Sequence, residues 1–281
     1  MQHARRVRVN DVELSYIEKG TGEPVVFVHG TLGSLAPFSD LVERFGDTRR
    51  AVAYSRRFHP PNPCDDTEAT YDIRLHASDL AGLLRALDLA PAHIVGTSYG
   101  AYIALLLALT DPGLLRSIVA CEPPMLPLLR ASPDGHRMLE EFLTHALEPS
   151  REAFQRGDAA AGVARFMDGI LGRPGAFASL TPTVQRSFLE AAPELRLESL
   201  APIDRYMPAL TPEELSRIRM PVLLVGGERS PRLFHKILDE LARQLPYARR
   251  ILIARAGHAM YVANPRDFES AVREFLSGET S

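Results

Sequence analysis

Residues of the three types that catalyse acyl transfer, a serine, a histidine and a carboxylate, follow apolar stretches of this sequence. Ser98 is the centre of a G-x-S-x-G pattern at residues 96–100, just before the long apolar stretch 101–109. A strand, a sharp turn and a helix around this pattern form a nucleophile elbow. Glycines let the strand and helix pass closely, and the helix start favours developing negative charge. The pattern predicts a nucleophilic Ser98, although a glycine-rich turn with Ser98 capping the helix would share it.

The proton of a serine hydroxyl must be removed by a base. Among nine histidines, His258 is the best candidate, because it follows the apolar run 250–254 in a loop of small residues. It also follows Ser98 in the chain, in the order typical of a nucleophile elbow. The alternative is an ordinary surface or core histidine.

A carboxylate beside the base would hold the imidazole in one tautomer and stabilise the imidazolium. Glu122 directly follows the apolar stretch 115–121, whereas Glu228 and Asp239 lie further along the chain. We predict that Glu122 is this acid. A solvated carboxylate that ends a strand would show the same pattern.

Apolar runs alternate with helical patterns along most of the chain, which predicts a mainly parallel sheet with helices on both faces. We therefore expect an α/β fold with an eight-stranded sheet. Ligands bind such sheets at the carboxyl ends of the strands, where Ser98, Glu122 and His258 are expected. The expected strands are a hairpin at 5–9 and 12–17 and runs at 24–28, 51–54, 94–95, 115–121, 221–226 and 250–254, and the expected helices are 72–88, 101–109, 233–245 and 265–276.

The alternation is interrupted after Glu122. Residues 124–215 show helical segments and no convincing strand pattern. We therefore expect a helical cap at 124–215, inserted after the sixth strand, and a core domain made of 1–123 and 216–281. The cap would lie over the carboxyl ends of the strands.

These features together resemble the α/β-hydrolase superfamily over essentially the whole chain. The resemblance rests on Phe27-Val28-His29-Gly30, the 96–100 pattern, the insert, and residues 256–260 with Asn264-Pro265 behind them. The fold hosts many chemistries, so the substrate does not follow from it.

The resemblance implies Ser98 as nucleophile and His258 as base. It also implies that the backbone amides of Thr31 and Tyr99 form the oxyanion hole. A histidine at the position of His29 usually shapes its loop in this superfamily, so we expect that role rather than a catalytic one.

The acid departs from the commonest pattern of the superfamily, in which an aspartate follows the strand at 222–225. Here the turn 227–231 reads Gly-Glu-Arg-Ser-Pro, so that Ser230 stands at the acid position. Zearalenone-type lactone hydrolases are similar in having a strand-end glutamate followed by proline, as in Glu122-Pro123. This likeness covers a few residues and supports the position of the acid more than the substrate.

Segments around the expected site supply candidate substrate contacts, most of them apolar, as suits an adaptable pocket. Arg56 and Arg57 could bind an anionic substrate, but we expect them to be solvated. The candidate contacts are Leu32, His59, Met125, Met167, Met260 and Tyr261.

The composition is that of a globular protein: 281 residues, 46% hydrophobic, 24% charged, with a net charge of −3. No basic run suggests nucleic acid or an anionic membrane as a partner. The N-terminus lacks the apolar core of a signal peptide, and no 18-residue apolar stretch occurs. Two cysteines make no disulfide framework, and no histidine–cysteine cluster has metal-ligand spacing. We expect a cytoplasmic protein without cofactor or metal; its oligomeric state stays open.

These observations predict a serine hydrolase that cleaves an ester or lactone of an apolar small molecule through an acyl-enzyme. Two alternatives stay open. One is an enzyme of the same fold that hydrolyses carbon–carbon bonds or catalyses a non-hydrolytic biosynthetic step. The other is a ligand-binding protein with little turnover.

Overall fold

The sheet at the centre of the molecule has eight strands in the order β1-β2-β4-β3-β5-β6-β7-β8. A computed structural model describes residues 4–64 and 71–278. The pairs β1–β2 and β2–β4 are antiparallel and all other pairs are parallel, which confirms the predicted α/β fold. The strands are β1 (Arg5–Val9), β2 (Val12–Lys19), β3 (Pro24–Val28), β4 (Arg50–Tyr54), β5 (Ala92–Thr97), β6 (Leu115–Cys121), β7 (Val222–Gly227) and β8 (Ala248–Ile253).

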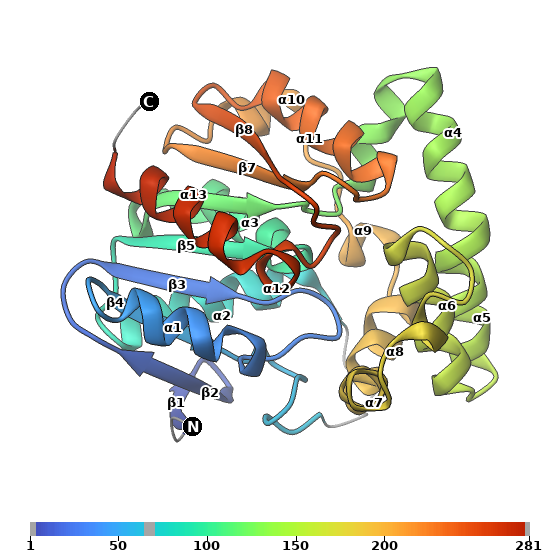
Figure 1. The fold of residues 1–281 in the computed structure, drawn as a ribbon, viewed down its shortest axis with the longest axis horizontal. Helices are drawn as coiled ribbons and strands as arrows, with labels where there is room; N and C mark the ends of the chain where they lie inside the picture. Colours follow the sequence, from blue (N-terminus) through green and yellow to red (C-terminus); the bar gives the residue numbers. More distant parts are fainter. Residues whose placement is uncertain (1–3, 65–70, 279–281) are drawn as a thin grey trace.

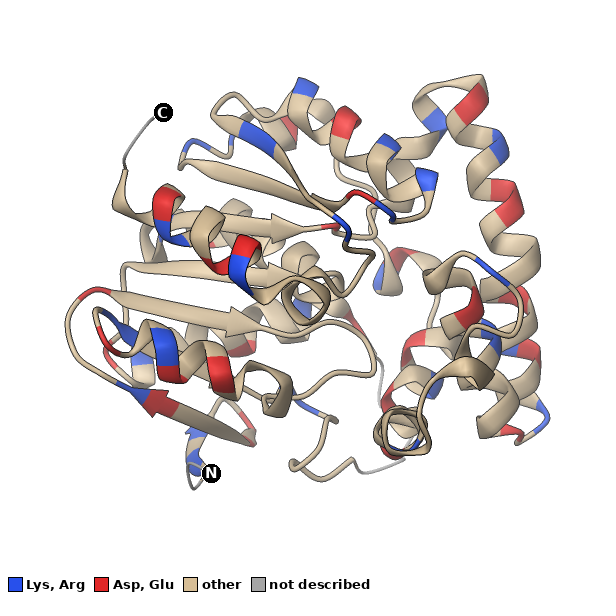
Figure 2. Ribbon diagram, in the orientation of Figure 1, with Lys and Arg blue, Asp and Glu red and all other residues tan. Residues whose placement is uncertain are grey.

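Helices cover both faces of this sheet (Figure 1). The inner strands β3, β5 and β7 carry no charged residue, as expected for parallel strands buried on both faces. Figure 2 shows that charges of both signs lie mainly on the surrounding helices. One face packs against α1 (Ser39–Phe45), α12 (Met260–Ala263) and α13 (Pro265–Ser277), and the other against α2 (Ile73–Ala86), α3 (Tyr99–Thr110) and α11 (Arg232–Gln244).

Between β6 and β7, every residue is described and the regular elements are all helical. Helices α4 to α8 lie at the carboxyl ends of the strands, on the right of Figure 1. Their buried side chains join those of α2, α3 and α11 in one continuous apolar core. The boundaries 124–215 for a separate cap remain a prediction. The longer helices are α4 (Pro133–Phe142), α5 (Glu148–Gln155), α6 (Ala159–Leu171), α7 (Pro182–Glu190) and α8 (Ala192–Leu200), followed by the short α9 (Ile203–Tyr206) and α10 (Pro212–Ser216).

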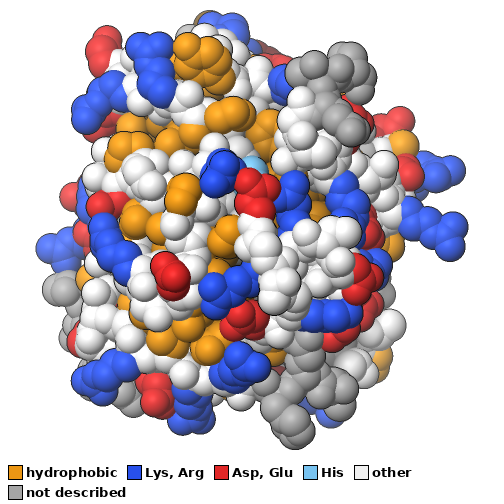
Figure 3. Space-filling view, turned by 90° about the vertical axis from the view of Figure 1, so that its left-hand side faces the viewer, with side chains coloured by type: hydrophobic (Ala, Val, Ile, Leu, Met, Phe, Trp, Pro, Cys, Tyr) orange, Lys and Arg blue, Asp and Glu red, His pale blue; other side chains and the backbone are white. Residues whose placement is uncertain are grey.

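The surface away from these helices carries acidic and basic side chains beside one another (Figure 3). None of the helices in the described part of the chain is both long and apolar enough to cross a membrane.

Two glycines let β5 turn directly into α3. A Cβ on Gly96 would lie 2.6 Å from the backbone of Ala101, and a Cβ on Gly100 would lie 2.2 Å from the carbonyl oxygen of Val28. Both distances are far inside van der Waals contact. The strand and the helix therefore approach as closely as the sequence pattern predicts.

Gly100→Ala should destabilise the protein by more than about 2 kcal/mol, because the new methyl group meets backbone that cannot move away. Gly113→Ala is the matched control, since a Cβ there meets nothing within 4 Å. Urea unfolding measures both. Equal free energies of unfolding for the two variants would contradict the proposed close packing.

Candidate active site

Ser98 and Glu122 leave neighbouring strands at the same edge of the sheet. Ser98 follows β5 and Glu122 follows β6, and the amide of Ser98 donates to the carbonyl oxygen of Cys121 at 2.7 Å. The amide of Glu122 in turn donates to Val225 at the end of β7. Adjacent strands lie about 4.8 Å apart. The two side chains are therefore close neighbours in the position where α/β sheets bind ligands.

Glu122 contacts His258 directly. Its Oε2 lies 2.6 Å from Nδ1 of His258, and its Oε1 accepts from the amide of Gly227 at 2.7 Å. The ring of Phe234 stacks on the imidazole, with centroids 4.4 Å apart. Because Nδ1 is held by the carboxylate, Nε2 is the nitrogen left to accept a proton.

The pKa of Glu122 is lowered below its ordinary value. Burial alone would raise this pKa, but the hydrogen bond and charge of His258, together with the contacts of Ser230 and the Gly227 amide, outweigh burial. The Ser230 hydroxyl also lowers this pKa, although its geometry falls short of a hydrogen bond. Glu122 is therefore ionised at neutral pH, as a group that stabilises an imidazolium must be.

The other carboxylates that the sequence offered lie away from His258. Glu228 is exposed and accepts from the amide of Arg255 at 2.7 Å. Asp239 is exposed and pairs with Arg250. Of the candidate acids, Glu122 is the one that contacts the histidine.

Three residues at this edge of the sheet have backbone angles that favour glycine. The φ angle is 50° at Ser98, 45° at Glu122 and 57° at Leu32, which follows β3. Such angles cost about 1–3 kcal/mol each and persist where the surrounding structure enforces them. Their concentration at three strand ends marks this edge as a candidate functional site.

The backbone amides of Thr31 and Tyr99 have no acceptor in the part of the chain that the structure describes. No hydrogen bond among the described residues uses either N–H group, and Tyr99 begins α3. Gly30 approaches Ser98 so closely that a Cβ on it would lie 2.8 Å from the Cβ of Ser98. Two free donors thus flank the serine, as an oxyanion hole requires. Ser98 and His258 themselves, both described, are not joined by a hydrogen bond, and such contacts often tighten only with substrate.

His29 uses both ring nitrogens to hold its loop. Nδ1 donates to the carbonyl oxygen of Gly30 at 2.9 Å, and Nε2 accepts from the amide of Arg56 at 2.9 Å. Burial lowers the pKa of His29 well below its usual range. The ring is neutral and structural, in agreement with the loop-shaping role expected from the sequence.

The predicted substrate contacts pack into apolar cores. Leu32, Met125 and Met167 belong to the core shared by the sheet and the helices between β6 and β7. Met260 and Tyr261 pack on the opposite face, where the Tyr261 ring lies 5.1 Å from that of Phe38. Their contact with a substrate stays a prediction.

Arg56 and Arg57 are not solvated, contrary to expectation. Only 1% of Arg56 and 6% of Arg57 is exposed, because carboxylates on other elements neutralise them. Arg57 pairs with Asp79, with Nη2 2.7 Å from Oδ1. Arg56 faces Glu194 and Glu198 on α8 at 3.5 and 3.6 Å.

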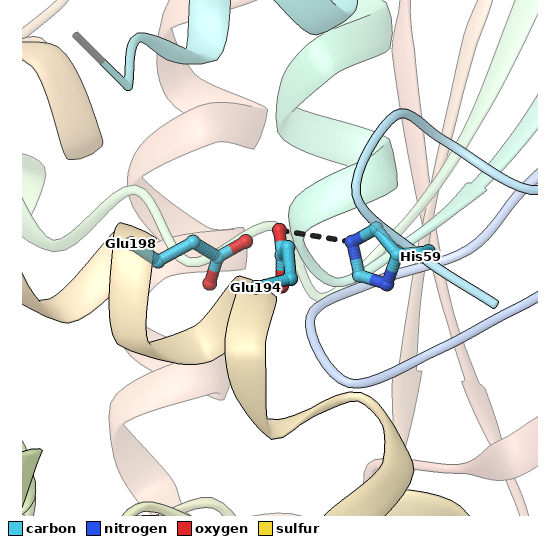
Figure 4. A group of neighbouring side chains, drawn as sticks. All are labelled: His59, Glu194 and Glu198. Carbon is cyan, nitrogen blue, oxygen red and sulfur yellow. Dashed lines mark ion pairs between the residues drawn. The ribbon is translucent and has the colours of Figure 1, made fainter. Parts of the chain in front are cut away.

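His59 belongs to the same buried group (Figure 4). Its Nε2 lies 2.9 Å from Oε1 of Glu194, and both side chains are fully buried. Its Nδ1 donates to the carbonyl oxygen of Gly33 at 2.9 Å. With both nitrogens engaged, the predicted substrate contact of His59 has no support in this geometry. We call Arg56, His59, Glu194 and Glu198 the buried ionic cluster.

The ligand atoms of His59, Glu194 and Glu198 lie within 4.8 Å of one another, as in some metal sites. Buried carboxylates require a positive charge, and here the Arg56 guanidinium supplies it. A divalent ion would lie beside that guanidinium and be repelled by it. The residues therefore fit an ion-pair network rather than a metal centre.

A cavity of about 540 Å³ opens where the helices between β6 and β7 meet the start of α11. Its lining includes apolar Met138, Phe142 and Leu233, and it contains none of the predicted contacts. Pro231 and Arg232 at its edge follow Ser230, next to the acid. Four arginines also line it: Arg137, Arg165, Arg173 and Arg232.

Comparison with known proteins finds similar chains among hydrolases. A 2-(acetamidomethylene)succinate hydrolase from Mesorhizobium japonicum is 35% identical over 119 residues, which is 42% of each chain, so this match spans less than half of either protein. The sn-1-specific diacylglycerol lipase ABHD11 of Xenopus laevis is 26% identical over 98% of this chain and 86% of its own. The solved structure of Est816, described as an N-acyl homoserine lactone degrading enzyme, superposes with a TM-score of 0.75 at 23% identity, covering 96% of this chain and 100% of that one.

The sequence model of the Alpha/beta hydrolase family matches residues 25–271, which includes the strand ends that carry Ser98, Glu122 and His258. This chain therefore belongs to the alpha/beta hydrolase family and is a hydrolase.

Proposed function

We propose that this hydrolase cleaves carboxylic esters, lactones among them, through an acyl-enzyme on Ser98. The single observation that carries the proposal is the contact of 2.6 Å between Glu122 and His258, one strand away from a serine on a strained elbow. The two free amides of Thr31 and Tyr99 add support, because a tetrahedral intermediate needs such donors.

In the proposed reaction, Ser98 Oγ attacks the ester carbonyl carbon while Nε2 of His258 takes the hydroxyl proton. The amides of Thr31 and Tyr99 stabilise the negative charge that develops on the carbonyl oxygen. The intermediate collapses, and His258 returns the proton to the departing alcohol. A water molecule, deprotonated by His258, then attacks the acyl-enzyme and releases the acid and free Ser98.

Glu122 acts in both half-reactions without itself taking a proton. Its carboxylate holds the Nδ1–H tautomer, so that Nε2 faces the serine, and it stabilises the imidazolium formed in each step. The lowered pKa of Glu122 supports this role, because a protonated carboxyl could not provide the charge.

The class of substrate rests on two observations. The Xenopus laevis relative, matched over 98% of this chain, is named as a lipase of diacylglycerol, which is an ester. The cavity at the start of α11 is lined by apolar side chains, by four arginines and by the acidic Glu141 and Asp168, and none of Ser98, Glu122 and His258 lines it. The first observation favours an ester with a large apolar part, as the sequence suggested, and the second leaves room for polar groups beside it.

Ser98→Ala should abolish hydrolysis of a p-nitrophenyl ester, with a loss of about 10³-fold or more in kcat, because the members of a triad act as a unit. A fluorophosphonate probe should label the native protein at Ser98 and leave the variant unlabelled, as mass spectrometry of the labelled peptide would show. Native protein that folds but is neither labelled nor active would favour the binding protein instead.

Glu122→Gln should lower kcat by about 10²- to 10⁴-fold without unfolding the protein, because the amide cannot stabilise the imidazolium. Glu228→Gln and Ser230→Ala are the comparison variants and should cost far less, since neither side chain contacts His258. Circular dichroism checks the folding of each. A larger loss in Glu228→Gln than in Glu122→Gln would show that the acid is misplaced.

A further inference from the structure

The turn that carries Thr31 is strained. Residues 30–33 form a turn closed by the Gly33 amide on the Gly30 carbonyl oxygen at 3.2 Å. Its third residue, Leu32, has a φ of 57°, an angle at which turns usually place glycine. A strained turn keeps its shape only where other contacts enforce it. Those contacts decide where the Thr31 amide points.

The buried ionic cluster supplies contacts to this turn at three separate residues. Arg56 Nη2 donates to the carbonyl oxygen of Gly30 at 3.2 Å, and His59 Nδ1 donates to that of Gly33 at 2.9 Å. The Thr31 hydroxyl donates to Oε2 of Glu198 at 2.8 Å. The cluster thus forms hydrogen bonds with Gly30 and Gly33 at the two ends of the turn, and with Thr31, which carries the proposed oxyanion donor.

Both carboxylates of the cluster come from α8, in the segment between β6 and β7. Figure 4 shows Glu194 and Glu198 on one face of this helix, directed at the loop of His59. All four side chains of the cluster are fully buried in the molecule. A buried hydrogen bond to a charged or shared-proton group is short and directional, so α8 fixes the turn rather than merely touching it.

From these contacts we infer that Glu198 is a positioning residue for the oxyanion hole: through the Thr31 hydroxyl, a helix outside the sheet sets the direction of the Thr31 amide. The inference rests on the proposed function, since it concerns the oxyanion donor of that same site. By this inference, α8 affects the chemical step through Glu198, in addition to stabilising the chain between β6 and β7.

A positioning role and a merely structural role differ in what they change. The oxyanion exists only in the transition state and the intermediate, so a displaced donor lowers kcat and leaves KM nearly unchanged. Loss of a merely structural contact lowers the free energy of unfolding, or alters substrate binding, without a selective effect on kcat.

The test uses Thr31→Val, which keeps the backbone amide and the size of the side chain but removes the hydroxyl. It should lower kcat for a p-nitrophenyl ester, and the rate of Ser98 phosphonylation by a fluorophosphonate, by roughly 3- to 10-fold. Thr31→Ser restores the donor and should restore both rates.

Glu198→Leu removes the acceptor and should give a loss similar to that of Thr31→Val. The double variant should lose no more than the worse single variant, because both changes break one contact. Glu198→Gln keeps an oxygen acceptor and should retain kcat within about twofold of the native value. If Glu198→Leu does not fold, the Thr31 pair together with Glu198→Gln decides the question.

Ser150→Ala is the matched control. Ser150 is fully buried in α5 and donates to the carbonyl oxygen of Gly162 at 2.9 Å, so its loss loosens the same segment without touching the turn. It should lower the melting temperature and leave kcat unchanged.

An unchanged kcat in folded Thr31→Val, or additive losses in the double variant, would overturn the inference. Either result with an inactive Ser98→Ala would leave the proposed function intact. Full activity in Ser98→Ala would instead overturn the proposed function.

Discussion

The site depends on a constraint of the backbone: a parallel sheet brings its strand ends to one edge, and the chain must turn away there within a few residues. At Ser98, Glu122 and Leu32 it does so through left-handed angles that side chains other than glycine rarely adopt. Those angles direct the serine hydroxyl, the carboxylate and the Thr31 turn toward a common point. The closely packed strands behind them hold these strained angles in place, because they leave the backbone no room to relax.

Burial of charge is the second constraint, and it joins the sheet to the helices that cover its edge. Arg56 cannot stay buried without Glu194 and Glu198, and these cannot stay buried without Arg56. Burial, followed by the charge of Glu194, raises the pKa of Glu198 well above its usual range. Because Nδ1 of His59 donates to the Gly33 carbonyl oxygen, the other ring nitrogen, Nε2, is an acceptor in the neutral ring. Nε2 lies 2.9 Å from Oε1 of Glu194, which is also an acceptor, so a proton must lie between the two atoms. Burial also raises the pKa of Glu194, so protonation of these carboxylates lowers the number of charges that the interior must compensate.

The elements that position Ser98, Glu122 and His258 could be predicted from the sequence because each has a local signature. Apolar runs in the sequence predicted the strands. The carboxyl ends of parallel strands lie at the same edge of a sheet, so residues that follow these runs are expected to lie near one another. The cluster has no such signature, since Arg56 and Glu194 are far apart in the chain, and an isolated arginine is usually solvated. One signal was present: Glu194 and Glu198 are four residues apart on one helix face, where like charges repel unless a cation faces them. For the apolar candidates the sequence could not separate a pocket from the core, because an apolar residue between two layers packs into the core by default, and their contact with a substrate stays a prediction.

The proposed acid could reach His258 from either of two neighbouring strands, β6 or β7. Glu122 leaves β6, yet its amide donates to Val225 and its carboxylate accepts from Gly227, both on β7. The carboxyl group therefore lies between the two strands, beside Ser230, whose hydroxyl is buried without a hydrogen bond. An acid from the turn after β7 would have to occupy this same space to reach His258. One carboxylate fills the site, and the serine at the other position is small enough to leave room for it.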